Sequence, residues 1–399
     1  MNDLLKKYDQ AHLLKFNDEL SAEEQKHLMD QINSIDFDLV KSLYEGVGKK
    51  KEIASISDMP SFGTHQRYVD LGLESFKNGE YAVVTMAGGQ GTRLGYDGPK
   101  GTYLLEYGIN KSLFEIQCDK LKHIYNMSGV YPTWYIMTSY QNDLATREFF
   151  LSNNYFDYPN DKIFFFPQKE LPMIDSHGLV LMDSKFNIKM GANGSGGVFS
   201  ALVEHGMLKK MKEDHVKWIF IGGIDNILLP IDNPDLIGFA KEKHFLVASK
   251  IVSKAYPDEK VGVFCRVNGL PSVIEYMDMT NEMNHRTYED GKLVFGDAHI
   301  LCNLFNLDIL EDIAKNNLPY SGAFKKTNYL DNLGNLITSE VPNAYKFETF
   351  IFDAFSYVED MGLLTDQREH IFAPIKNALG NDSPLTASEL YLNFYKGAK

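Results

Sequence analysis

Residues 81–103 of this 399-residue chain join a short apolar strand to a glycine-rich loop, and few folds accommodate that combination. The stretch has the sequence YAVVTMAGGQGTRLGYDGPKGTY. Its first six residues are apolar or β-branched, which is typical of a buried strand. Glycines then recur, with Arg93 and Lys100 among them, at Gly88, Gly89, Gly91, Gly95 and Gly98. Because glycines let backbone N–H groups approach an anion, the pattern predicts a phosphate-binding loop at the carboxyl end of a strand in an α/β sheet.

Two familiar phosphate-binding loops do not match this stretch. A P-loop ends in Gly-Lys-Ser/Thr, whereas Lys100 is followed by Gly101 and no hydroxyl is available for magnesium. The dinucleotide fingerprint needs a third glycine where this chain has Leu94. An ordinary turn needs one or two glycines and no paired cations, so it does not account for the loop either.

Composition limits the classes of partner. The formal net charge is −14, which argues against nucleic-acid binding but allows a nucleotide substrate held by a few local cations. The three cysteines, which lie far apart without metal-ligand spacing, are Cys118, Cys265 and Cys302. The N-terminus is too charged for a signal peptide, and no long apolar run follows. We therefore expect a soluble, cytoplasmic protein that does not bind membranes.

The chain alternates strands and helices after residue 80. Strands are predicted at 81–86, 133–138, 163–166 and 216–221, with helices between them, and this order favours a mostly parallel sheet with helices on both faces. From about residue 246 the pattern becomes rich in strands. We expect a helical N-terminal segment at 1–60, a central domain at 61–365 and a small C-terminal segment at 366–399.

Two further stretches could contribute to a site. A second glycine cluster, residues 191–197, precedes a helix predicted at 198–212 and suits close approach of a ligand. Asp225 follows the strand 216–221, where α/β enzymes hold a metal or a polar ligand. An aspartate at this point could equally cap a helix or form a turn.

The glycine loop, GGQGTRLG followed by Pro99-Lys100-Gly101, resembles the signature of the UDP-sugar pyrophosphorylases, which are sugar-1-phosphate uridylyltransferases. The resemblance extends over about residues 80–377 and is closest to the UDP-N-acetylglucosamine and bacterial probable-uridylyltransferase branch. It also rests on segments at 166–168, 225–226, 261–267, 273–276, 346–353 and 372–377.

The resemblance implies a Rossmann-like nucleotidyltransferase fold, similar to GT-A, with small N- and C-terminal domains. The implied reaction is UTP plus a sugar 1-phosphate giving a UDP-sugar and pyrophosphate, with Mg²⁺ as cofactor. Implied catalytic residues are Arg93, Lys100 and Lys346, and Asp225 would hold the metal. The residues implied to contact the nucleotide are Ala87, Gly88, Gly89, Gly91, Gln168 and Gly194. The residues implied to contact the sugar are Ser195, Gly262, Glu275 and His299.

Several of these residues have simpler interpretations when taken alone. A glutamine such as Gln168 is more often a satisfied loop residue. Glu275 could pair with a cation on a neighbouring strand, which we weigh equally with a role in the sugar pocket. Lys346 could be a solvated surface lysine.

Two positions depart from the family pattern, and both belong to the implied sugar site. Ser195 and His299 stand where the family has asparagines. A serine offers one hydroxyl in place of an amide, and a histidine is bulkier and can titrate. We therefore expect UTP binding to be retained, while the sugar does not follow from the family. N-acetylglucosamine 1-phosphate and glucose 1-phosphate are the first candidates, although a bulkier His299 could crowd an N-acetyl group.

Two other functions compete with an active uridylyltransferase. One is a non-catalytic relative that binds UTP or a UDP-sugar through an altered sugar pocket. The other is a glycosyltransferase on a related sheet, but that class usually has an Asp-x-Asp motif, and residues 224–227 lack the second acid. The expected partners are thus small-molecule substrates, and the sequence makes no prediction of the oligomeric state.

Overall fold

The computed structural model describes residues 2–48 and 53–397 of the chain, which forms two compact units. The first unit combines the described part of Met1–Glu52 with Lys169–Gly197 and Leu318–Phe350. The second combines Ile53–Gln168, Val198–Asn317 and the described part of Ile351–Lys399. The domain boundaries predicted after residues 60 and 365 stay a prediction, and residues 1, 49–52 and 398–399 of the terminal segments lie outside the described residues.

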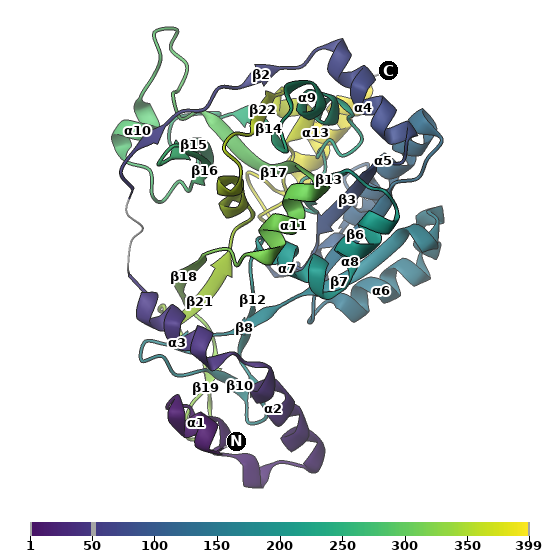
Figure 1. Cartoon of the computed structure of the whole chain (residues 1–399). Coiled ribbons are helices and arrows are strands. Elements are labelled where there is room, and N and C mark those ends of the chain that lie inside the picture. Colours follow the sequence, from purple (N-terminus) through teal and green to yellow (C-terminus); the bar gives the residue numbers. More distant parts are fainter. Residues whose placement is uncertain (1, 49–52, 398–399) are drawn as a thin grey trace. The chain divides into compact units, whose positions relative to one another are not determined.

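The second unit is built on a mixed sheet (Figure 1). Its main strand order is β2 (Phe62–Gly63), β22 (Gly362–Thr365), β14 (Val247–Ser253), β17 (Asp297–Asn306), β13 (Trp218–Gly223), β3 (Tyr81–Met86), β6 (Thr133–Ser139) and β7 (Ile163–Gln168). Neighbours in this order are parallel except for β17, which is antiparallel to both β14 and β13. Three more strands extend the sheet, β1 (Ile56–Ser57), β15 (Val263–Val267) and β16 (Leu270–Ile274).

The central strands are buried on both faces, which is why apolar residues predominate in them. All seven residues of β6 and five of the six residues of β3 are buried. The second unit's helices include α4 (Gln66–Lys77), α5 (Leu113–Ser128), α6 (Asp143–Ser152), α8 (Met207–Glu213), α9 (Asp235–Lys243), α10 (Asn281–His285), α11 (Leu307–Lys315), α12 (Arg368–Ile371) and α13 (Pro384–Gly397). The predicted α/β fold with a mostly parallel sheet is confirmed.

The helix predicted over residues 198–212 is two helices. The first is α7 (Gly197–Glu204), and α8 begins at Met207. Gly206 between them has a φ of 71°, a left-handed conformation that interrupts a right-handed helix. None of the described helices is both long and apolar enough to cross a lipid bilayer.

The first unit packs N-terminal helices against short strands from later in the chain. Its helices are α1 (Asn2–Lys7), α2 (Ala22–Ser34) and α3 (Phe37–Gly46). Its strands are β8 (Glu170–Pro172), β9 (Ile174–Asp175), β10 (Met182–Ser184), β11 (Asn187–Ile188), β12 (Met190–Ala192), β18 (Tyr320–Lys325), β19 (Tyr329–Leu330), β20 (Leu336–Ile337) and β21 (Ala344–Thr349). A capping box formed by Ser21 and Glu24 begins α2. Leu28 and Ile32 of α2 share a core with Ile174 and Phe347, so these helices pack against the strands.

A buried ion-pair network joins three elements of the second unit. The Lys250 ammonium on β14 lies 2.8 Å from Asp235 at the start of α9 and 2.6 Å from Asp366, which follows β22. Burial opposes the charge on Lys250, but the two carboxylates outweigh it and raise the lysine pKa. The lysine therefore compensates two carboxylates that have little access to water.

Replacing this lysine should strongly destabilise the second unit. Lys250→Met leaves two carboxylates without their cation, and breaking a buried pair in this way costs about 3–5 kcal/mol. Urea unfolding followed by tryptophan fluorescence, with both Trp134 and Trp218 in this unit, measures the loss. Lys292→Ala, which removes an exposed cation beside Asp290, is the control and should change stability by less than about 1 kcal/mol. Equal midpoints for the two variants would contradict the role of Lys250.

Candidate active site

The glycine loop after β3 is held by main-chain hydrogen bonds across its base. The Gly91 N–H donates to the Gly98 carbonyl at 2.9 Å, and the Lys100 N–H donates to the Gly89 carbonyl at 3.0 Å. Gly95 adopts a φ of 69° in the turn between them. A Cβ at Gly91 would lie 2.6 Å from the ring of Tyr96, so this position has no room for a side chain. The loop therefore has a defined shape that depends on its glycines.

Three consecutive amides of this loop are left without partners. Asn142 donates its side-chain N–H groups to the carbonyls of Ala87 at 3.0 Å and Gly89 at 3.4 Å. The backbone N–H groups of residues 88–90 have no hydrogen-bond acceptor within the part of the chain that the structure describes. Successive free amides of this kind form a concave site for an anion.

Gln168 at the end of β7 lies against this loop. Its side chain is buried, and its amide nitrogen occupies the space that a Cβ at Gly88 would need. Its Oε1 is buried without a hydrogen-bond partner among the described residues. A buried amide with an unused acceptor can bind the edge of a ligand that offers a donor. The structure thus brings Gln168 together with the loop that runs from Ala87 to Gly91.

Asp225 follows β13 and faces the lysine of the glycine loop. Its Oδ2 lies 3.5 Å from the Lys100 ammonium, and the side chains are 35% and 16% exposed, respectively. Two main-chain bonds fix its backbone, from Ile224 N–H to the Met86 carbonyl and from Ile375 N–H to the Asp225 carbonyl. No described helix begins at Asp225, so of the alternatives left open, a helix cap does not apply.

Arg93 has a different environment. It lies on a single 3-10 turn, Thr92–Leu94, and its side chain is exposed. Within the described chain it has no ion pair, in contrast to Lys100. The structure therefore places Arg93 in the same loop without bringing its guanidinium to Asp225.

The predicted sugar-binding residues of the second unit form a separate group. The His299 N–H on β17 donates to the Gly262 carbonyl at 2.9 Å. A Cβ at Gly262 would lie 3.3 Å from the Glu275 carboxylate. Burial, with a smaller effect from Asp278, raises the Glu275 pKa, and the described residues supply no ion pair to it. The alternative of Glu275 pairing with a strand cation therefore does not apply, and its carboxylate is free to accept hydrogen bonds.

The imidazole of His299 is enclosed by three phenylalanine rings. Its ring centre lies 5.3 Å from that of Phe264, 6.0 Å from Phe352 and 5.8 Å from Phe355. Its Nε2 is 3.3 Å from the Oδ1 of Asn303. Burial lowers the pKa of His299 to about 4, although the bond to Asn303 acts in the opposite direction. The ring is therefore neutral near pH 7.

The remaining predicted residues belong to the first unit. Gly194 has a φ of 84°, and a Cβ there would clash with the Thr349 carbonyl. Ser195 follows it in a turn and is partly buried. Lys346 on β21 lies 2.7 Å from the Glu348 carboxylate and is 22% exposed. Burial opposes ionisation of Glu348, but the hydrogen bond and charge of Lys346 lower its pKa overall. Lys346 is thus paired rather than freely solvated.

Two polar residues that the sequence analysis missed support these loops. Asn142 contacts the glycine loop. Its position shortly after the predicted strand 133–138 was the one indication in the sequence that it could lie near that loop. The Lys120 ammonium donates to the carbonyls of Ile227 at 2.8 Å and Leu229 at 2.7 Å, just after Asp225. Lys120 lies between Ile116 and Ile124 in the apolar stripe of a helix, and this position could have indicated a buried lysine.

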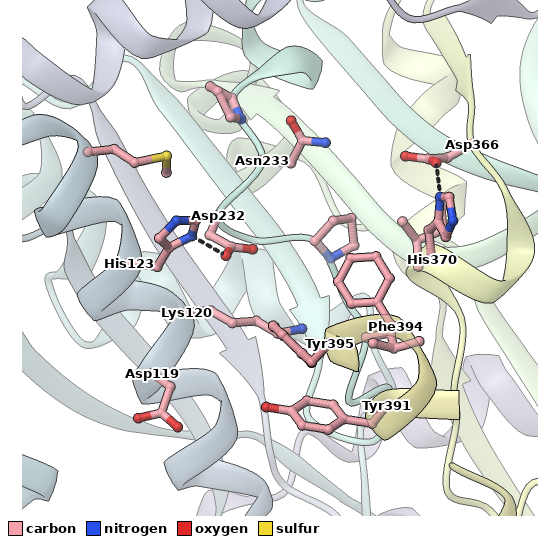
Figure 2. A pocket seen from close by; sticks show the side chains of 15 residues that line it. Asp119, Lys120, His123, Asp232, Asn233, Asp366, His370, Tyr391, Phe394 and Tyr395 are labelled. Atoms are coloured by element: carbon pink, nitrogen blue, oxygen red, sulfur yellow. Dashed lines mark hydrogen bonds and ion pairs between the residues drawn. The ribbon is translucent and has the colours of Figure 1, made fainter. Parts of the chain in front are cut away.

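One cavity of the second unit lies away from the predicted site residues. It has a volume of about 690 Å³, and none of those residues lines it. Figure 2 shows Lys120 and His123 of α5 facing it together with Tyr391 and Tyr395 of α13. The His123 imidazole lies 2.8 Å from Asp232, which raises the His123 pKa. The cavity therefore adjoins the loop after Asp225 without including that residue.

Comparisons with known proteins cover nearly the whole chain. A family model described as UTP–glucose-1-phosphate uridylyltransferase matches residues 37–393. A UDP-N-acetylglucosamine pyrophosphorylase of Saccharomyces cerevisiae is 35% identical over 97% of this chain and 85% of its own length. The human UDP-N-acetylhexosamine pyrophosphorylase-like protein 1 is 33% identical over 82% of this chain and 67% of its own length. The structure of a Trypanosoma brucei uridine diphosphate N-acetylglucosamine pyrophosphorylase, solved with an inhibitor, matches 98% of this chain and 83% of its own with a TM-score of 0.83 and 28% identity.

The neutral His299 should make stability depend on pH. Its pKa of about 4 in the folded chain lies below the ordinary value of about 6.5, so folding favours the unprotonated ring. The resulting stability is present above pH 6.5 and is lost as the pH falls toward 4. His299→Gln, which cannot titrate, should lose less stability than the wild type between pH 6.5 and 4 in urea unfolding.

The exposed His177 in the first unit provides the control. His177→Gln should keep the pH dependence of the wild type. If His299→Gln also kept it, the imidazole would not be buried in its neutral form.

Proposed function

The chain belongs to the UTP–glucose-1-phosphate uridylyltransferase family, and we propose that it transfers the uridylyl group of UTP to a sugar 1-phosphate with release of pyrophosphate. The observation that carries this proposal is the loop of free amides, residues 88–90, with Gln168 beside it and the Lys100–Asp225 pair at its end. The free backbone amides and Lys100 suit phosphates, and the buried side-chain amide of Gln168 suits the edge of a base. A nucleoside triphosphate presents both groups.

The reaction is an in-line displacement at the α-phosphorus. A phosphate oxygen of the sugar 1-phosphate forms the new bond to phosphorus, and the bond to the pyrophosphate oxygen breaks. No enzyme nucleophile is required, so positioning and neutralisation of charge must provide most of the rate enhancement. The site fits that demand because its polar groups are amides and a lysine rather than an activated serine or cysteine.

We assign nucleotide contacts to the second unit. The free amides near Gly88 and Gly89 would bind phosphate oxygens, and Ala87 and Gly91 shape the loop around them. Gln168 would donate to and accept from the edge of uracil, since an amide offers both functions. Lys100, held near the loop by its main-chain bond to Gly89, would offset charge on the α-phosphoryl oxygens and the leaving pyrophosphate.

A divalent metal fits the site through Asp225. Within the described residues no three acidic, histidine or cysteine side chains are grouped to hold a metal by themselves. One partly exposed carboxylate suits Mg²⁺, which usually takes one or two carboxylates plus substrate phosphates and water. When bound, Mg²⁺ would supply Lewis-acid neutralisation of phosphate charge.

The other assignments rest on the family resemblance. Arg93 would meet the phosphates from solvent, since it is exposed and unpaired among the described residues. Lys346 would contact the sugar phosphate, and Gly194 would contact the nucleotide through its backbone. The resemblance assigns sugar contacts to Ser195 of the first unit and, separately, to Gly262, Glu275 and His299 of the second. The described cysteines are all free thiols, which supports a reducing cytoplasmic location.

The non-catalytic alternative is not favoured. The relatives that match nearly the whole chain are named as pyrophosphorylases, that is, as enzymes. Here Lys100 and Asp225 are both retained and lie 3.5 Å apart. Catalysis therefore accounts for more of the site than binding alone.

Loss of either member of this pair should strongly lower turnover without unfolding the chain. Lys100→Ala and Asp225→Ala should each lower kcat by about 10²-fold or more, because each removes a charge that acts on the transition state. Pyrophosphate release from UTP and a sugar 1-phosphate measures this, with circular dichroism to check folding. Lys111→Ala, which removes a more exposed lysine paired with Asp119, should keep wild-type turnover. Normal turnover in Lys100→Ala would contradict the assignment.

The same assay tests the proposed function and the sugar. Wild-type protein with UTP and Mg²⁺ is offered N-acetylglucosamine 1-phosphate, glucose 1-phosphate and related sugar phosphates. We expect UDP-sugar formation with a preference that follows from Ser195 and His299 rather than from the family. Exclusive use of N-acetylglucosamine 1-phosphate would refute crowding by His299, and no UDP-sugar with any substrate would refute the function.

A further inference from the structure

We infer that Asn142 is a positioning residue for UTP: it holds the carbonyls of Ala87 and Gly89, so that the N–H groups of Gly88 and Gln90 face the phosphates. This inference rests on the proposed function. Asn142 lies in the turn between β6 and α6 and is fully buried. It does not touch the reacting atoms itself.

The hydrogen bonds of Asn142 allow only one orientation of its amide. Its Oδ1 accepts the Ser139 N–H at 2.8 Å, and its Nδ2 donates to the carbonyls of Ala87 and Gly89. A flipped amide would set an oxygen against two carbonyls and an NH₂ group against an N–H. The bond to Ser139 therefore locks the two donors toward the loop.

The position of Asn142 would ordinarily give it a different task. It is the N-cap residue of α6, where an asparagine usually accepts a hydrogen bond from the first turn of its own helix. The structure gives it no such bond. Its side chain is directed to the glycine loop instead, across 53 and 55 positions of sequence.

The consequence for the loop follows from peptide geometry. A peptide unit carries its C=O and N–H on opposite sides, so fixing the Ala87 carbonyl toward Asn142 turns the Gly88 N–H away from it. The same holds for the Gly89 carbonyl and the Gln90 N–H. Both are among the three N–H groups, at residues 88–90, that have no acceptor among the described residues. Asn142 thus preorganises the anion site before the nucleotide arrives.

Three substitutions at this position separate positioning from simple stabilisation. Asn142→Ser is smaller than the native residue and keeps one donor, and Asn142→Ala removes both donors. Asn142→Asp keeps the acceptor for Ser139 but sets an oxygen against the two loop carbonyls. We expect KM for UTP to rise in the order Ser, Ala, Asp, by about tenfold in Asn142→Ala, while KM for the sugar 1-phosphate stays within about twofold of wild type.

Gln10 offers a matched control in the first unit. It is a buried amide that donates to the Gly178 carbonyl at 3.0 Å and accepts the Val180 N–H at 2.8 Å. Gln10→Ala should lower the melting temperature without changing KM for UTP. A rise in KM for UTP in the Asn142 variants alone supports the inference.

Other outcomes would overturn the inference. It fails if KM for UTP is unchanged in Asn142→Ala and Asn142→Ser, if Asp and Ala behave alike, or if both substrates are affected equally. Calorimetric titration with UTP and Mg²⁺ gives the same comparison without turnover, so a wild type that binds UTP but forms no UDP-sugar refutes the function and still tests Asn142. If the other variants fold poorly, Asn142→Ser still allows UTP binding to be compared with that of the wild type.

Discussion

The parallel alignment of β3, β6, β7 and β13 is the constraint on which the candidate site depends. Because these strands run in one direction, the segments that follow them emerge at the same edge of the sheet. The glycine loop, Asn142, Gln168 and Asp225 each lie within a few residues of a buried strand end. Their backbones are therefore anchored to the buried central strands of the second unit, which limits the conformational freedom that is lost when a ligand binds.

Polar side chains then set the shape of the loops at that edge. Asn142 and Lys120 donate to main-chain carbonyls, and the Asn226 side chain bonds the Ile371 carbonyl and the Ala373 N–H. Asn226 is thus committed to holding the segment after Asp225, although it stands next to the predicted metal ligand. The bonds of Asn142 satisfy loop carbonyls with side-chain donors, so the neighbouring backbone N–H groups remain available to a ligand. Electrostatic preorganisation of this kind is what a displacement without an enzyme nucleophile requires.

The parts of the site that are close in sequence were predictable, and the parts formed by long-range contacts were not. The glycine loop and Asp225 follow strands whose apolar runs are evident, so their location at a sheet edge followed directly. The support from Asn142 depends on a contact across more than 50 residues. The enclosure of His299 depends on Phe352 and Phe355, which follow it by more than 50 residues, so neither its neutral state nor its packing could be inferred from its own segment. Gly206 was not recognised as a break between two helices because a single glycine is also tolerated within one.

The contact between Gly88 and Gln168 has a consequence for changing the nucleotide that such a site accepts. The amide of Gln168 fills the space above Gly88, so any side chain at that glycine would push the glutamine out of its position. Under the roles proposed for these two residues, a side chain placed at Gly88 to alter phosphate binding would therefore also disturb recognition of the base.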